Sequence, residues 1–322
     1  MRRRTFLGAA MGAAVIPAAY GRVRGASGLL SAFASPSTDA LRPMALGLMI
    51  QPATGAEAAI ARVKELGLPT CFLSLDGYIG KFTPSLVAEM RDLLDKYGIV
   101  ATSAEVVGPG RLVWDFLDGP STIGLVPPAT RAARIDALRQ TSDFAKQLGI
   151  KRVQTHCGFL PENPRDPLYG EAVEAIRTVA DYCAANGQDF LMETGQETPI
   201  TMKRAIDDVN RPNLGVGLDT ANLILYGKAN PVDAVEIIGP YVRSMHAKDG
   251  RWPTDPMKLG EEVLIGTGRV DFFKVFTKLH QLGYNGAITI EREISGPQQF
   301  EDVKKEKAYL ENVIARVQNG RA

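Results

Sequence analysis

The 322-residue sequence contains little cysteine, histidine or tryptophan: three, three and two residues respectively. The three cysteines, Cys71, Cys157 and Cys183, are odd in number and have no CxxC spacing. This excludes a disulfide framework and a zinc knuckle. Beyond the N-terminal region the sequence also lacks a run apolar enough to span a bilayer, which excludes stable membrane insertion of the mature protein.

Positive charge is scarce once the N-terminus is set aside. Residues 1–34 carry five arginines and no acidic residue. Without them, 37 basic residues fall to 32 against 36 acidic ones. A domain of that balance has no basic footprint, so we expect no nucleic-acid partner.

The N-terminus predicts an export signal. A basic start is followed by an uncharged Ala- and Gly-rich stretch, Thr5–Tyr20, too short to span a bilayer comfortably. The run "RRRTFLG" resembles a twin-arginine signal, with Phe6 and Leu7 after the arginines. "SAFAS" offers a cleavage site after Ala34, and an amphipathic or disordered start is the alternative. We expect residues 1–34 to be signal and linker, the twin-arginine export machinery to be a partner, and the mature protein, residues 35–322, to be periplasmic or otherwise exported.

After residue 43 the sequence repeats one pattern, in which a short β-rich run is followed by a loop and an amphipathic helical stretch. Strands alternating with helices favour a parallel sheet, and eight such units favour a single-domain (β/α)8 barrel. An open doubly wound sheet is the alternative, but no strand leads into a G-x-G-x-x-G turn. The expected strands lie at residues 44–51, 70–77, 99–107, 151–159, 189–195, 214–221, 242–249 and 286–293.

Polar residues end four consecutive strands: Glu193, Asp219, His246 and Glu291. The chemistry of such barrels lies at the C-terminal ends of the strands. Each of these residues follows an apolar run, where an unpaired charge is costly. Three carboxylates and one imidazole suit Mn²⁺, Mg²⁺ or Co²⁺, with Zn²⁺ also possible. The alternative is that each is a salt-bridged or structural residue, with Arg243, Lys248 and Arg292 as the available cations.

The segments "LMETG", "GLDTAN", "MHAKDG" and "ITIERE" resemble the metal-binding strands of the xylose isomerase-like superfamily, and more closely its sugar (phosphate) isomerase/epimerase branch. The tail "IGTGRVDFFKVFTKLHQLGYNGAITIERE" (265–293) is the most specific match. The resemblance implies that Glu193, Asp219, His246 and Glu291 hold one divalent ion, with Mn²⁺ first and Mg²⁺, Co²⁺ or Zn²⁺ as alternatives. It also implies that Glu193 and Glu291 act as the acid/base pair.

The sequence departs from that branch at two positions. Many relatives have a histidine where this chain has Asn222, and the arginine expected after His246 is matched only loosely by Arg251. These departures bear on the substrate more than on the metal. We expect substrate contacts from His156, Lys248, Asn222 and Trp252. Alternative roles are a packed histidine for His156, and for Lys248 a salt bridge to Asp249 or Glu291.

Three further strand-end and loop residues have expected roles. Glu105 and Asp76 are expected to cap a helix or to bond a loop. Trp114 has an aromatic face suited to a sugar ring, or packs a loop helix.

Together these features predict a metal-dependent sugar or keto-sugar isomerase or epimerase that works by proton transfer through an enediolate. Its partner is a small carbohydrate, unphosphorylated because of export. The first alternative is a lyase or hydratase that cleaves 3-keto-glycosides by β-elimination, and the second is a non-catalytic sugar-binding barrel. A nuclease of the endonuclease IV type is disfavoured by the scarce histidines and the acidic domain. The sequence leaves the oligomeric state open, with a homo-oligomer as one possibility.

Overall fold

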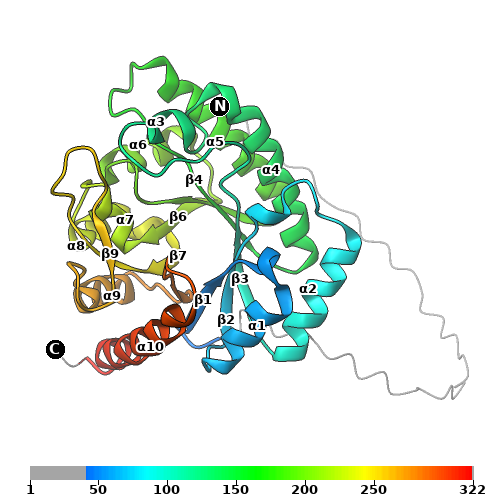
Figure 1. Ribbon diagram of the computed structural model, residues 1–322. Helices are drawn as coiled ribbons and strands as arrows, with labels where there is room; N and C mark the ends of the chain where they lie inside the picture. Colours follow the sequence, from blue (N-terminus) through cyan, green and yellow to red (C-terminus); the bar gives the residue numbers. More distant parts are fainter. Residues whose placement is uncertain (1–40, 321–322) are drawn as a thin grey trace, which may run out of the picture. The chain divides into compact units, whose positions relative to one another are not determined.

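In the computed structural model, residues 41–320 are described. The expected signal, its cleavage site and the twin-arginine motif lie outside these residues and stay predictions. Eight parallel strands close into a barrel in the order β1-β10-β7-β6-β5-β4-β3-β2. Figure 1 shows these strands in the centre with the helices around them. The expected (β/α)8 barrel is confirmed.

The barrel strands are shorter than the sequence runs that predict them, because the ends of those runs belong to the loops of the mouth. Their bounds are β1 (Leu46–Ile50), β2 (Thr70–Ser74), β3 (Val100–Glu105), β4 (Arg152–His156), β5 (Asp189–Glu193), β6 (Leu214–Asp219), β7 (Val242–Ala247) and β10 (Ile288–Ile290). Two further strands, β8 (Asp249–Arg251) and β9 (Glu261–Val263), form a separate antiparallel pair.

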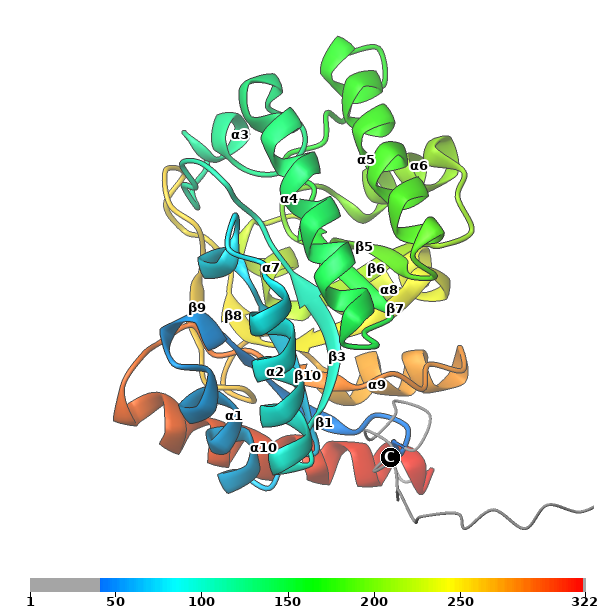
Figure 2. The same cartoon turned by 90° about the vertical axis from the view of Figure 1, so that its right-hand side faces the viewer.

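The helices lie on the outside of the strands (Figure 2). They are α1 (Ala56–Glu65), α2 (Pro84–Tyr97), α3 (Gly119–Thr122), α4 (Pro128–Gln147), α5 (Pro167–Ala185), α6 (Pro199–Val209), α7 (Thr220–Leu225), α8 (Pro231–Ile238), α9 (Phe272–Gln281) and α10 (Pro297–Gln318). Short 3₁₀ turns lie at Pro52–Thr54, Asp76–Tyr78 and Gly239–Tyr241. Arg62 of α1 donates to Gln299 of α10 at 3.4 Å, where the first and last helices meet.

Local sequence explains most of these boundaries. Thr83, Asp166 and Thr198 cap the starts of α2, α5 and α6, each with a proline in the first turn. These side chains satisfy amide groups that the first turn of a helix leaves free. Strand β2 is buried along its whole length, as expected for a strand covered on both faces. Each of the three cysteines is buried and free.

Asp249 organises the loop after the hairpin. Its carboxylate accepts hydrogen bonds from the backbone amides of Gly250 and Val270 at Oδ1, and of Gly266 and Gly268 at Oδ2, all at 2.9–3.0 Å. A Cβ at Gly268 would lie 2.2 Å from Asp249 Oδ1, so glycine is required there. The G-x-G of "IGTGR" therefore wraps a buried carboxylate and forms no phosphate cradle.

Arg134 anchors the long segment between β3 and α4. Its guanidinium is 1% exposed and donates to the backbone carbonyls of Pro109, Arg111, Thr122 and Gly124 at 2.6–3.4 Å. Burial lowers the pKa of this arginine. One side chain thus holds two stretches of this segment together, 109–111 and 122–124.

A second polar network joins β10, β9 and α10. Arg292 forms ion pairs with Glu262 at 2.8 Å and Asp302 at 3.0 Å, and its Nε lies 3.9 Å from Glu306. Glu306 also accepts a hydrogen bond from the backbone amide of Ile265 at 3.2 Å. Burial, opposed by that amide and by Arg292, raises the pKa of Glu306 to about 7.

We expect the raised pKa of Glu306 to make stability fall as pH rises. The unfolded carboxyl ionises near its ordinary value of 4.5, whereas the folded one keeps its proton to about pH 7. The stabilisation by the protonated Glu306 carboxyl is therefore complete below about pH 4.5. Up to about 3 kcal/mol of it is lost as the pH rises towards 7. Urea unfolding between pH 5 and 8 should show this slope, and Glu306→Gln should flatten it. The exposed Glu311→Gln is the control, and an equal slope in both variants would contradict the prediction.

Between residues 41 and 320, none of the helices combines the length and the apolar character needed to cross a membrane.

Candidate metal centre and active site

Four side chains from four neighbouring strands meet at one end of the barrel. Glu193 and Asp219 are the last residues of β5 and β6, His246 is the penultimate residue of β7, and Glu291 directly follows β10. One ligand atom from each lies within 4.8 Å of those of the others. Nδ1 of His246 is 3.2 Å from Glu193 Oε1 and 3.0 Å from Glu291 Oε2. We call these four residues the acidic cluster.

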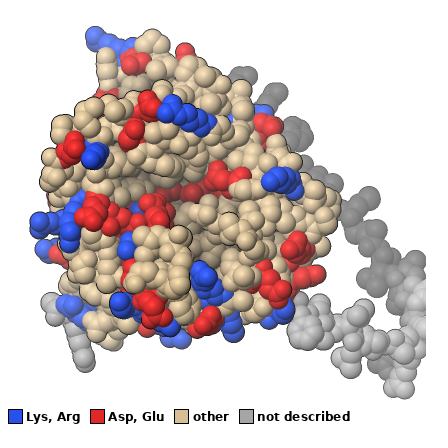
Figure 3. Space-filling model, in the orientation of Figure 1, with Lys and Arg blue, Asp and Glu red and all other residues tan. Residues whose placement is uncertain are grey.

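The acidic cluster is almost closed to solvent, with exposed fractions of 0% for Asp219, 1% for His246, 2% for Glu193 and 8% for Glu291. Figure 3 shows a groove across the middle of the molecule with acidic side chains along it. Buried carboxylates need compensating positive charge. The arginines considered from the sequence do not supply it, because Arg243 pairs with Asp189 and Arg292 with Glu262 and Asp302.

Lys248 is the lysine that reaches the acidic cluster. Its Nζ lies 3.1 Å from Asp219 Oδ2 and 3.4 Å from Glu291 Oε2, and it donates to Glu293 Oε1 at 3.0 Å. The expected salt bridge to Glu291 is present. The alternative pairing with Asp249 is wrong, because that carboxylate is taken up by backbone amides.

Gln154 and His156 contact the carboxylate oxygen of Glu193 that does not face His246. Gln154 donates to Glu193 Oε2 at 3.0 Å, and His156 Nε2 lies 3.4 Å from the same oxygen. A Cβ at Gly217 would come within 2.2 Å of Gln154 Oε1, so the glycine of β6 makes room for this amide. Outer contacts of this kind fix the direction of a ligand side chain.

The pKa values of the cluster show how strongly its groups interact. Burial would raise the pKa of Glu193, but His156 and His246 hold it well below its usual range. Burial would also raise the pKa of Glu291, but Lys248 and His246 lower it to about 2. Burial would lower the pKa of His246, but Glu193 and Glu291 raise it to about 10. Burial raises the pKa of Asp219 well above its ordinary value.

This donor set fits a divalent cation. Asp219 Oδ2 and Glu291 Oε2 are buried and accept no well-formed hydrogen bond from the described residues. Three carboxylates and an imidazole are ligands that Mn²⁺, Mg²⁺ and Co²⁺ accept. The acidic cluster could therefore hold a metal ion, with each of the four residues offering one atom.

Glu105 lies beside the acidic cluster, a role that was not predicted for it from the sequence. A helix cap or loop bond was expected, but its carboxyl lies against Glu193 and is 3% exposed. Burial, and then Glu193, raise its pKa well above the ordinary value. Its position at the end of β3 was a usable signal. Asp76, in contrast, bonds a loop as expected, accepting from the amides of Val107 and Gly108 at 3.0 and 2.7 Å.

The other expected substrate residues lie at different distances from the cluster. Asn222 Nδ2 is 3.5 Å from Glu193 Oε1, and its backbone amide donates to Asp219 Oδ1 at 2.7 Å. His156 adjoins Glu193, as described above. Trp252 follows β8 and is 39% exposed, and no contact between it and the cluster is found among residues 41–320. Arg251, the loose candidate, pairs with Glu261 across the hairpin.

Aromatic rings and unpaired polar atoms lie beside the cluster. The ring of Trp114, 44% exposed, meets His156 edge-on at 4.9 Å between centroids. Gln196 Oε1 lies 3.2 Å from His156 Nδ1. Gln196 Nε2 and Tyr226 Oη are buried and make no well-formed hydrogen bond in the described chain, although the two side chains interact with each other. Both oxygens of Glu197 are likewise unpaired. The sequence analysis did not single out these last three residues.

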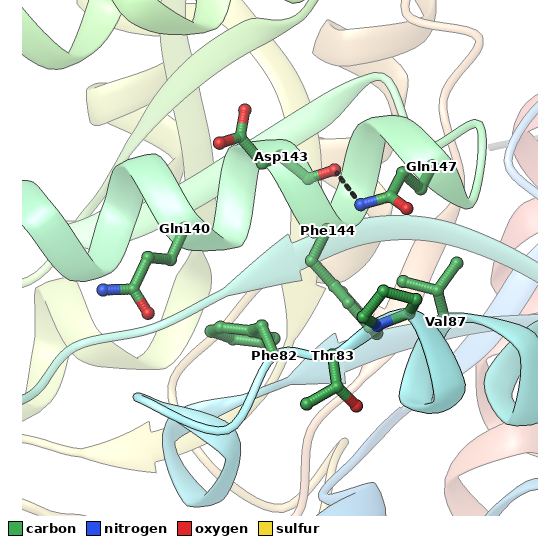
Figure 4. Close-up of a pocket in the computed structure, with 8 residues that line it drawn as sticks. Phe82, Thr83, Val87, Gln140, Asp143, Phe144 and Gln147 are labelled. Carbon is green, nitrogen blue, oxygen red and sulfur yellow. Dashed lines mark hydrogen bonds between the residues drawn. The ribbon is translucent and has the colours of Figure 1, made fainter.

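A separate hollow lies on the helical side of the barrel, between α2 and α4 (Figure 4). It is lined by Phe82, Thr83, Pro84, Val87, Gln140, Asp143, Phe144 and Gln147. It shares no residue with the acidic cluster, and we assign it no part in the site.

The fold and the cluster agree with the family to which the chain can be assigned. A family model described as "Xylose isomerase-like TIM barrel" matches residues 60–313. The chain belongs to this family.

Many solved structures share the fold, among them the following two. The xylose isomerase domain protein from Planctomyces limnophilus is 33% identical, covers 86% of this chain and 99% of its own, and gives a TM-score of 0.81. A xylose isomerase-like TIM barrel protein from Mycobacterium smegmatis, solved in complex with magnesium, is 18% identical with a TM-score of 0.66, covering 88% of this chain and 99% of its own.

Curated relatives match part of the chain, and two of them have a named activity. L-ribulose 3-epimerase from Methylomonas sp. is 27% identical over 64% of this chain and 68% of its own length. Inosose dehydratase from Geobacillus kaustophilus is 23% identical over 46% of this chain and 54% of its own. The export signal, the export partner and the oligomeric state remain predictions.

Proposed function

We propose that this protein is a divalent-metal-dependent isomerase or epimerase of a sugar or keto-sugar, and that its substrate is unphosphorylated. The observation that carries the proposal is the acidic cluster: three carboxylates and one imidazole, buried together at the ends of β5, β6, β7 and β10. The similarity to L-ribulose 3-epimerase supports the same reaction class. The magnesium complex of the structural relative supports a hard divalent ion, and Mn²⁺ is our first choice.

Glu193, Asp219, His246 and Glu291 would hold the ion. When bound, a divalent ion supplies a Lewis acid that stabilises the negative charge of an enediolate. The chain supplies the proton transfers. Strands β5 and β10 are separated by β6 and β7 in the barrel, so Glu193 and Glu291 approach a substrate from different sides. One carboxylate removes the proton next to the carbonyl and the other returns it. A return to the opposite face inverts the carbon.

Neighbouring groups position these carboxylates and shield them from water. Gln154 and His156 hold Oε2 of Glu193, which leaves Oε1 facing His246. Lys248 and His246 contact Oε2 of Glu291. Gln196 Nε2 and Tyr226 Oη, which interact with each other without a well-formed hydrogen bond, would donate to sugar hydroxyl groups.

The test measures metal content and proton exchange on the full chain. We expect about one ion per chain after loading with Mn²⁺, and, with ketohexoses in D₂O, incorporation of deuterium next to the carbonyl together with an epimer or isomer detected by NMR. Chelation by EDTA should stop the exchange. No bound metal after Mn²⁺ loading would overturn the proposal, and metal binding without exchange on any sugar would favour a non-catalytic barrel.

A lyase or hydratase is the second candidate, favoured by the match to inosose dehydratase. The same carboxylates would remove the proton, and a substituent on the adjacent carbon would leave with the electron pair. The NMR experiment separates the two classes with 3-keto-glycosides as added substrates. An unsaturated product and a released alcohol or water would identify elimination, whereas an epimer of unchanged composition would identify isomerisation.

A further inference from the structure

Lys248 occupies a position that is unusual for a lysine. Its side chain is 1% exposed, and three carboxylates surround its ammonium group: Asp219 at 3.1 Å, Glu291 at 3.4 Å and Glu293 at 3.0 Å. Two of these belong to the acidic cluster. The third, Glu293, lies two residues beyond Glu291, and its side chain is 56% exposed. An ammonium group is a compact point charge with no acceptor atoms. The ammonium group of Lys248 therefore occupies the place that a small cation bound by three carboxylates would take.

The chain places Lys248 and Glu293 just outside the acidic cluster. Lys248 lies two residues after His246, directly beyond the end of β7, and Glu293 lies two residues after Glu291, in the segment that follows β10. The 3.0 Å contact between Lys248 Nζ and Glu293 Oε1 joins these two segments beside the cluster.

The charges around the ammonium bear on how many ions fit. Glu193, Asp219 and Glu291 bring carboxylates into a buried space, and the Lys248 ammonium lies against two of them. A second divalent ion beside Asp219, Glu291 and Glu293 would have to displace or closely approach the ammonium, at a large electrostatic cost in a buried site.

We propose that Lys248 is a built-in cation that restricts the cluster to a single divalent ion, by occupying the place between Asp219, Glu291 and Glu293 where a second ion would bind. It acts on the reaction through Asp219 and Glu291 and is a positioning residue. The inference rests on the proposed function of the preceding section. To the metal site proposed there it adds the number of ions bound per chain and the residue that sets this number.

The test is a Mn²⁺ titration of the full chain, with free Mn²⁺ followed by EPR. We expect about one ion per wild-type chain and about two in Lys248→Met, which keeps the volume of the stem and removes the charge. The first ion should bind about tenfold or more tightly in the variant, because a neighbouring positive charge is gone. Lys248→Arg, which keeps the charge, should hold one ion.

The control is Lys274→Met, which removes an exposed ammonium paired with Asp271 on α9 and should leave both number and affinity unchanged. If Lys248→Met is unfolded by circular dichroism, Lys248→Gln, which still donates to the carboxylates, is titrated instead. One ion of unchanged affinity in the neutral variant, or two ions in the wild type, would overturn the inference. A wild-type chain that binds no Mn²⁺ would instead overturn the proposed function itself.

Discussion

Glu193→Gln should abolish metal binding and lower turnover by about a thousandfold or more. The carboxylate lies 3.2 Å from His246 Nδ1, and Gln154 and His156 hold its other oxygen. Glutamine keeps the size and one carbonyl oxygen but loses the negative charge, which both a metal ligand and a proton acceptor need. The measurements are elemental analysis of the Mn²⁺-loaded protein and deuterium exchange from D₂O.

The matched control for this variant is Glu174→Gln on α5, where the carboxylate pairs with Arg177 at the surface. It should keep both metal and turnover. Circular dichroism should show the same helix content for both variants. Full metal content and unchanged exchange in Glu193→Gln would remove this residue from the metal site and from the acid/base pair.

Asp249→Ala should lower the free energy of unfolding by about 3–5 kcal/mol. The variant leaves the amides of Gly250, Gly266, Gly268 and Val270 without the carboxylate to which all four donate. The amides of Gly250 and Val270 are buried, and a buried amide without an acceptor is costly, whereas those of Gly266 and Gly268 are part-buried. Urea unfolding monitored by circular dichroism in the presence of EDTA measures the change without a contribution from bound metal.

Asp271→Ala is the control, because this carboxylate lies in the same region but accepts one amide hydrogen bond, from Lys274, at the start of α9. Loss of such a cap costs about 1 kcal/mol. If the two variants unfold at the same urea concentration, Asp249 does not organise the 264–270 loop in the way the hydrogen bonds indicate.

The barrel was predictable because its signals are local. Strands β2 and β5 show buried apolar runs, and α1, α2 and α9 show apolar residues at three- and four-residue steps. Glycine also marks helix ends in the sequence, and Gly67, Gly98, Gly149, Gly187 and Gly283 all have positive φ. Helices α6, α8 and α10 each carry a proline in the first turn, a local signal of where a helix starts.

By itself the sequence determined the fold class and the four residues at the strand ends, because a polar side chain after an apolar run is visible within a few residues, and parallel strands bring their ends together. Only the tertiary structure decided what surrounds those residues. The contacts of Lys248 with Asp219 and Glu293, of Glu105 with Glu193, and of Asp249 with residues 266–270 join distant positions. Contacts between such distant residues depend on the order of the strands and on the path of the loops. Neither can be predicted from the local periodicity of the sequence.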